Sequence, residues 1–115
     1  MKVQILHNPR CSKSRATLQL LRDRDIDPEV ILYLENPPTT AQIEDILRML
    51  GLKPRELMRK GQSEYKDLQL DDTSLSDERL VAAMRQNPIL IERPIVLANG
   101  RAAIGRPPES VLEIL

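Results

Sequence analysis

The chain has 115 residues, enough for one domain with a buried core, and its 41% hydrophobic and 30% charged residues are typical of a soluble globular protein. Because 17 basic residues balance 17 acidic residues, the net charge predicts no global attraction to nucleic acid or to an anionic membrane. The chain has two tyrosines and no Phe or Trp, which argues against base stacking, and no apolar run reaches the roughly 20 residues that span a bilayer.

The first third of the chain predicts a strand, a helix and a second strand. Val3–Leu6 reads as a short buried strand that Asn8-Pro9 ends, and a helical apolar pattern starts at Ser12. Pro28 stops that helix, and the Val- and Ile-rich run 29–34 is the second strand.

The middle of the chain predicts helices. Thr39 and Gln42 have the spacing of a capping box, and Gly51 would close the helix that they start. Pro54 opens a short helix to about Lys60. The rest of this region predicts a polar stretch at 61–73 with a possible helical turn near 65–68, and a helix capped by Ser76 that ends by Asn87-Pro88.

The last part of the chain predicts a hairpin and a helix. Strands at 95–98 and 101–104 flank Asn99-Gly100, the strongest short signal for a type I′ turn, and Pro107-Pro108 open the final helix. The order predicts an α/β fold with a mixed four-stranded sheet and helices on both faces, a thioredoxin-like architecture. We expect a single domain over residues 1–115, with a helical insertion at about 39–87 between its halves.

Cys11 lies where the first strand meets the first helix. Unpaired N–H groups and the helix dipole favour a thiolate there, and the same groups can hold an oxyanion. Arg10, Lys13 and Arg15 crowd the thiol, and Ser12 and Ser14 can donate further hydrogen bonds. The alternative is an inert buried cysteine, but a strand-to-helix turn is a poor place to hide a side chain.

The chain holds one cysteine and one histidine, His7, so we expect no metal site, no bound cofactor and no internal disulfide. Redox chemistry at Cys11 must then take its second thiol from another molecule. His7 could orient the thiol, shuttle a proton or merely end the strand. The first residues turn polar too early for a secretory signal, so a cytoplasmic location is expected, and so is a monomer.

Three separated arginines form a second candidate group, because arginine forks bind tetrahedral oxyanions bidentately. Arg93 and Arg106 are bracketed by Pro or Gly at element ends, whereas Arg59 is indistinguishable by spacing from a solvated surface arginine. Pro94 opens a predicted central strand, where proline is unusual. A cis Arg93–Pro94 bond would explain it, and an ordinary trans proline at a strand start is the alternative.

The sequence resembles the glutaredoxin-coupled arsenate reductases over nearly all of its length. Five short blocks in the same order carry the resemblance: His7-Asn8-Pro9-x-Cys11 with Ser14-Arg15 and Thr17-Leu18, Glu56-Leu57-Met58-Arg59, Asn87-Pro88, Glu92-Arg93-Pro94-Ile95-Val96, and Gly105-Arg106-Pro107-Pro108-Glu109. One departure follows the cysteine, where this chain has Ser12-Lys13 and resistance-type members commonly have Gly-Thr.

The resemblance implies a role for each matching residue. Cys11 matches the nucleophile, His7 and Ser14 match residues credited with lowering its pKa, and Pro94 matches a cis proline. Arg59, Arg93 and Arg106 match the arginines that bind the oxyanion. The implied reaction is attack of Cys11 on arsenate, addition of glutathione as co-substrate, and resolution by glutaredoxin with release of arsenite.

Two other functions on the same fold remain open. One is a thiol-transfer protein that acts on glutathionylated partners rather than on arsenate. The other is a redox regulator that binds RNA polymerase, the Spx type, which senses oxidants through a Cys-x-x-Cys pair. Ser14 occupies the second position of that pair here, which excludes an internal disulfide switch but not a binding module.

Overall fold

The computed structural model describes residues 2–115, which form two compact units. One unit joins the chain up to Asn36 to Arg93–Leu115, and the other is the continuous segment Pro37–Glu92. The second unit is the predicted helical insertion, with wider bounds than the expected 39–87. Whether the chain acts as one domain stays a prediction.

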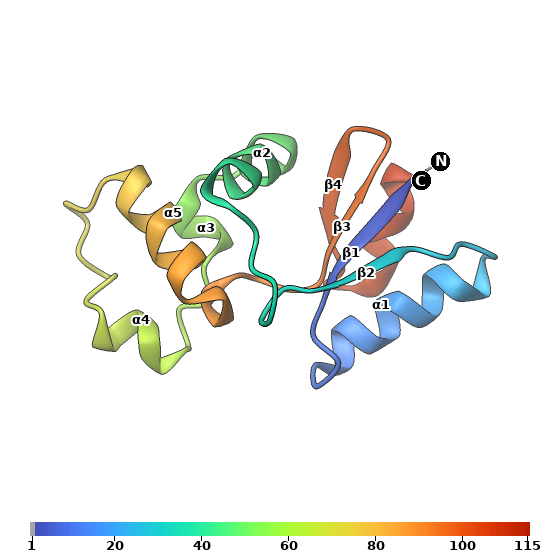
Figure 1. Ribbon diagram of the computed structural model, residues 1–115, viewed down its shortest axis with the longest axis horizontal. Coiled ribbons are helices and arrows are strands. Elements are labelled where there is room, and N and C mark those ends of the chain that lie inside the picture. The colour runs from blue at the N-terminus through green and yellow to red at the C-terminus, as the bar shows by residue number, and fades with distance from the viewer. Residues whose placement is uncertain (1) are drawn as a thin grey trace. The chain divides into compact units, whose positions relative to one another are not determined.

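The first unit is built on a four-stranded mixed sheet in the order β2-β1-β3-β4 (Figure 1). β1 is parallel to β2 and antiparallel to β3, and β3 is antiparallel to β4. The predicted α/β class and sheet are confirmed. Its elements are β1 (Val3–His7), α1 (Ser12–Asp23), β2 (Glu29–Leu32), β3 (Ile95–Ala98), β4 (Arg101–Ile104) and the 3₁₀ helix η2 (Pro108–Ile114).

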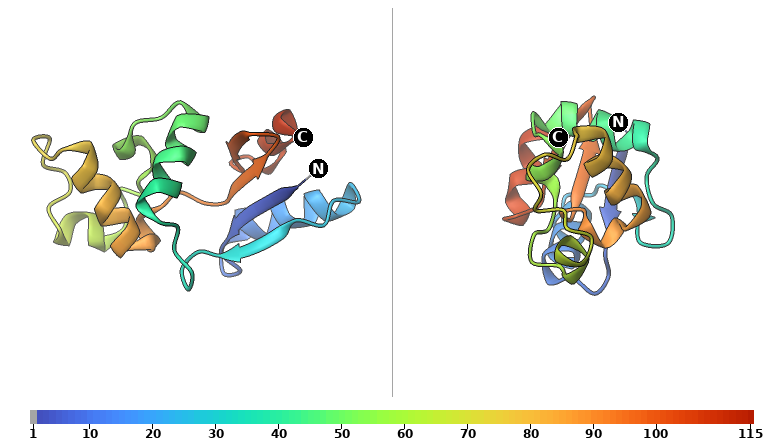
Figure 2. Two further views of the ribbon diagram at one scale, coloured as in Figure 1. Left: turned by 45° about the horizontal axis from the view of Figure 1, so that its top comes forward. Right: turned by 90° about the vertical axis from the view of Figure 1, so that its left-hand side faces the viewer.

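The core of this unit lies on one face of the sheet. Alternate strand residues point to the same face, and the register pairs Ile5 of β1 with Val96 of β3. The helix α1 runs alongside β1 (Figures 1 and 2), and both α1 and η2 pack on this face, so the expectation of helices on both faces is wrong within this unit. The core residues are Val3, Ile5, Leu18, Leu21, Val96, Ala98, Val111 and Ile114.

The β3–β4 hairpin turns as its sequence predicts. Asn99 and Gly100 have φ values of 56° and 70°, and positive φ at both central residues defines the type I′ turn. The Asn99 side chain also donates a hydrogen bond to the Ile114 carbonyl at 2.9 Å. This bond ties the hairpin to η2.

The second unit is helical. Its helix α5 contacts both α2 and α3. The predicted capping box at the start of α2 is confirmed, because the Gln42 N–H donates to the Thr39 hydroxyl and the Thr39 N–H donates to the Gln42 side chain. Its elements are α2 (Thr40–Leu50), α3 (Pro54–Leu57), α4 (Ser63–Asp67), α5 (Asp77–Gln86) and the 3₁₀ turn η1 (Pro88–Leu90).

Replacing Thr39 by alanine should lower the free energy of unfolding by about 1 kcal/mol, because the Gln42 N–H loses its acceptor. Thr40→Ala is the matched control, since Thr40 is the exposed first residue of α2 and its hydroxyl does not cap the helix. Urea denaturation of both variants measures the difference. Equal stabilities would show that the box does not hold α2.

Two elements end earlier than the sequence predicts. Helix α3 stops at Leu57 instead of continuing to Lys60, because Met58 is extended and pairs with Ile91. The strand β2 stops at Leu32 instead of residue 34, because the Leu32 carbonyl accepts the N–H groups of the following turn. In both places hydrogen bonds outside the element replace the ones that the local pattern favoured.

Candidate active site

The loop between β1 and α1 is held by backbone hydrogen bonds that centre on Asn8. The Asn8 carbonyl accepts the Cys11 N–H at 3.0 Å, and the Asn8 side-chain oxygen accepts the Arg10 N–H at 3.0 Å. Across the loop, the Arg15 guanidinium donates to the Pro9 carbonyl at 2.9 Å. Asn8 is itself buried, so the loop presents Cys11 from a fixed frame. From the local pattern, Asn8 was predicted only to end the strand, although asparagine is known to form such turns.

Cys11 is the N-cap residue of α1 and is partly buried. Burial raises the pKa of the Cys11 thiol, but this effect is outweighed by the backbone N–H groups of Ser14 and Lys13 and by the positive charge of Arg93, which all favour the thiolate. The net pKa is below the ordinary value for a cysteine. The thiol therefore combines partial exposure with an environment that activates a nucleophile.

The cation that acts on the thiol comes from a distant part of the sequence. The guanidinium of Arg93 lowers the pKa of Cys11 by its charge and by the hydrogen bond that it can donate to sulfur. The neighbouring Arg10, Lys13 and Arg15 side chains are exposed and are not among the charges that shift this pKa. Lys13 contributes through its backbone N–H instead.

His7 and Ser14 form a buried polar pair behind the loop. The Ser14 oxygen accepts the Asn8 N–H at 3.0 Å and lies 2.7 Å from His7 Nδ1. Ser14 is fully buried, so this hydrogen bond to His7 satisfies its hydroxyl inside the protein. The tautomer of His7 decides which of the two groups donates.

The electrostatics favour a neutral imidazole at His7. Burial lowers the pKa of His7, and the positive charges of Arg22 and Arg15 lower it further. The lowered pKa shifts His7 toward the neutral imidazole and so weakens any effect of a positive charge at His7 on the Cys11 thiolate. Its connection to Cys11 runs through Ser14, whose N–H faces the thiol, and through Asn8.

Arg93, Pro94 and Arg106 lie on two segments that hydrogen bonds join. The Arg93–Pro94 peptide bond is cis, and so is Arg106–Pro107, which the sequence did not predict. The Gly105 N–H donates to the Pro94 carbonyl at 3.0 Å, and the exposed Arg106 guanidinium donates to the Arg93 carbonyl at 3.3 Å. These contacts place Arg106 beside the residue that acts on Cys11.

Arg59 belongs to the helical unit, where it contacts two residues of η1. Its N–H donates to the Leu90 carbonyl at 2.7 Å, and its partly buried guanidinium donates to the Ile89 carbonyl at 3.4 Å. Its predicted role toward the oxyanion stays a prediction. The structure thus brings together Cys11, Ser14, Arg93 and, through its carbonyl contact, Arg106.

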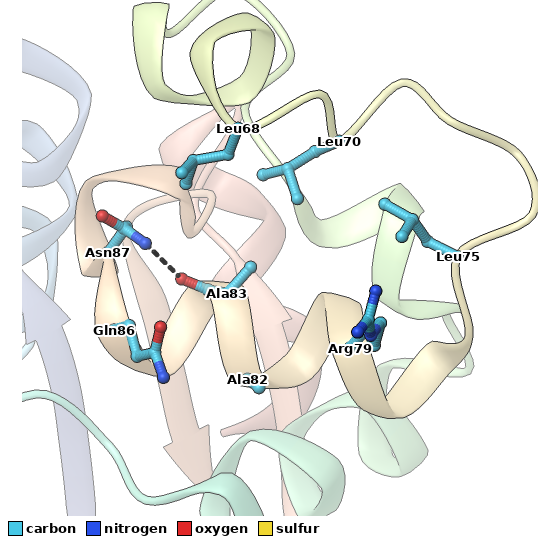
Figure 3. A pocket seen from close by; sticks show the side chains of 8 residues that line it. All are labelled: Leu68, Leu70, Leu75, Arg79, Ala82, Ala83, Gln86 and Asn87. Atoms are coloured by element: carbon cyan, nitrogen blue, oxygen red, sulfur yellow. Dashed lines mark hydrogen bonds between the residues drawn. The ribbon is translucent and has the colours of Figure 1, made fainter.

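Each unit has a hollow in its surface. The one of about 200 Å³ in the first unit reaches the site, since it is lined by His7, Asn8, Pro9, Arg10, Leu32, Leu34 and Glu35. The one of about 420 Å³ in the helical unit lies between α5 and the segment that leads to it (Figure 3). Its lining is mostly apolar and carries no nucleophile: Leu68, Leu70, Leu75, Arg79, Ala82, Ala83, Gln86 and Asn87.

Two further questions about residues 2–115 concern a metal-ion cluster and a membrane-spanning helix. Within this range, no group of three or more His, Cys, Asp or Glu side chains could hold a metal ion. No helix in the same range is long and apolar enough to cross a membrane.

Nearly the whole chain is similar to known proteins of one family. Residues 6–114 match the ArsC family. The chain is 58% identical to the uncharacterized protein YfgD of Escherichia coli K12, over 99% of this chain and 97% of that protein. It is 49% identical to an arsenate reductase of Neisseria meningitidis serogroup A, over 99% and 98% of the two chains. The structure named arsenate reductase from Vibrio cholerae is similar with a TM-score of 0.98 and 53% identity, covering 100% of this chain and 98% of that one.

Proposed function

Because the chain belongs to the ArsC family, we propose that it is an arsenate reductase whose nucleophile is Cys11 and whose reductants are glutathione and glutaredoxin. One observation carries the proposal: the only cysteine of the chain sits at a helix N-terminus, where N–H groups and Arg93 lower its pKa. A thiolate in an anion-binding setting suits attack on a tetrahedral oxyanion. The relatives named arsenate reductase support this choice of oxyanion.

In the proposed reaction, the Cys11 thiolate forms a sulfur–arsenic bond and a hydroxide leaves arsenate, taking up a proton to become water. Arg93 and Arg106 hold the remaining oxygens, and Arg59 keeps the oxyanion-binding role that the family resemblance implies. Glutathione then adds to the arsenic and displaces a second oxygen. A glutaredoxin thiolate attacks the glutathione sulfur, and the electron pair of that sulfur–arsenic bond reduces arsenic from the +5 to the +3 state. Hydrolysis releases arsenite and restores Cys11.

The lone cysteine makes an external thiol necessary in this scheme. Two electrons are needed for each arsenate, and two thiols that become one disulfide supply them. Cys11 is returned as a thiol and the chain has no second cysteine, so both of these thiols come from outside, one from glutathione and one from glutaredoxin. A reducing cytoplasm would provide both, and no metal or bound cofactor is required.

A coupled assay tests the proposal. The protein is mixed with arsenate, glutathione, glutaredoxin, glutathione reductase and NADPH, and we expect arsenate-dependent loss of NADPH that stops when glutaredoxin is left out. Activity that persists without glutaredoxin would contradict the proposed coupling. No turnover at high protein concentration would contradict the arsenate reductase assignment and favour a thiol-transfer or partner-binding role.

A further inference from the structure

Thr17 lies in the second turn of α1 and is fully buried, although its side chain is polar. Its hydroxyl donates to the Lys13 carbonyl, one helical turn back, at 2.8 Å, and the Gly105 carbonyl lies at 3.4 Å from the same oxygen. Thr17 and Gly105 are 88 residues apart in the sequence. The hydroxyl therefore bridges the start of α1 and the end of the hairpin.

Gly105 is packed so closely that any side chain there would force a neighbouring atom to move. A Cβ at this position would overlap the Thr17 hydroxyl and would lie 2.8 Å from Cγ of Pro94, closer than real Cβ atoms approach. Gly105 does not have a positive φ, so the need for glycine comes from the close contact and not from the turn. The backbone at Gly105 is thus pressed between α1 and the cis proline.

The two carbonyl groups near the Thr17 hydroxyl belong to Lys13 and Gly105, and each of these residues is connected to the candidate site. On one side, the N–H of Lys13 favours the Cys11 thiolate. On the other side, Gly105 directly precedes Arg106, which contacts the Arg93 carbonyl. The contact between Thr17 and Gly105 is therefore the packing point that joins the thiol-bearing turn to the arginine-bearing segment.

We propose that Thr17 and Gly105 are positioning residues that set the separation between the Cys11 thiol and the arginines that bind the oxyanion. The role rests on the proposed arsenate reductase function for its kinetic consequence, but the geometry at Cys11 does not depend on arsenate. A displacement of about 1 Å at a reacting group can cost on the order of 100-fold in rate. A methyl group at residue 105 would force a displacement of this kind between α1 and the Pro94 loop.

Gly105→Ala is the first test, with Gly61→Ala as the matched control, because a Cβ at Gly61 meets nothing within 4 Å. The pH dependence of iodoacetamide alkylation reports the pKa of Cys11, and the protection that arsenate gives against alkylation reports its affinity. For Gly105→Ala we expect a higher thiol pKa, about 10- to 100-fold weaker protection and a higher KM. Gly61→Ala should match the unaltered protein.

Thr17→Val and Thr17→Ser form a second, gentler pair that decides the matter if Gly105→Ala does not fold. Valine keeps the shape and removes the hydroxyl, so it should shift the thiol pKa and weaken protection, whereas serine should restore both. A loss of stability with unchanged thiol pKa and unchanged protection would overturn the proposal. If arsenate neither protects nor turns over in the unaltered protein, the proposed function fails, and the alkylation pKa still tests the positioning role.

Discussion

Replacing Cys11 by serine is expected to lower kcat/KM for arsenate by more than about a thousandfold, the scale on which enzymes lose activity with their nucleophile. The reason is that a serine hydroxyl stays protonated where the Cys11 thiol, with its lowered pKa, ionises. The chain has no other cysteine that could take over the reaction. The coupled assay with glutathione and glutaredoxin measures the loss.

Measurements of arsenate binding and of folding distinguish the loss of the nucleophile from a loss of structure in Cys11→Ser. The helix N–H groups and arginines remain in Cys11→Ser, so arsenate affinity by calorimetric titration should fall far less than turnover. Circular dichroism and thermal unfolding should match the unaltered protein, because the substitution exchanges one atom at a partly exposed position. Appreciable turnover by the variant would show that Cys11 is not the nucleophile.

Arg93→Lys is expected to weaken arsenate binding by about 10- to 100-fold, which corresponds to the loss of roughly 1.5–3 kcal/mol for a hydrogen bond to a charged group. Lysine keeps a positive charge but loses the planar fork that can bind two oxygens at once. Protection of Cys11 from alkylation at increasing arsenate concentrations measures the change. Arg101→Lys is the control, since the Arg101 guanidinium donates to the Glu113 carbonyl on the exposed side of η2.

The same variant should change the pH dependence at Cys11. Arg93 lowers the pKa of the thiol by favouring the thiolate, so weakening that contact raises the pKa toward its ordinary value. The alkylation rate of Arg93→Lys should then rise at a higher pH than that of the unaltered protein, and Arg93→Ala should move it further. Coincident pH profiles and unchanged arsenate protection would show that Arg93 is structural.

The features predicted best from the sequence are those encoded by a few adjacent residues. The Thr39–Gln42 capping box and the Asn99-Gly100 turn depend on backbone geometry within four residues, so local sequence decides them. The mixed character of the sheet followed from the same local elements together with the handedness of the first crossover. The position of Cys11 at a helix start was predictable for the same reason.

What the sequence could not supply are contacts between distant segments. Arg10 and Lys13 are next to Cys11 in the chain, yet Arg93 is the side chain whose charge acts on the thiol. Thr17 was visible only within a resembling block, because nothing near it in sequence indicates that Gly105 would pack against its hydroxyl. Helix α3 ended early for a related reason, since Met58 pairs with Ile91 rather than continuing the helix.

The buried hydrogen bonds from Asn8 through Ser14 to His7 brace the loop that carries the thiol. The Asn8 N–H donates to the Ser14 oxygen, which also shares a hydrogen bond with His7 Nδ1. All three residues are buried, so these polar groups are satisfied against one another rather than against solvent. Cys11 itself is partly exposed, so the thiol can reach an oxyanion while the residues that fix its loop stay buried.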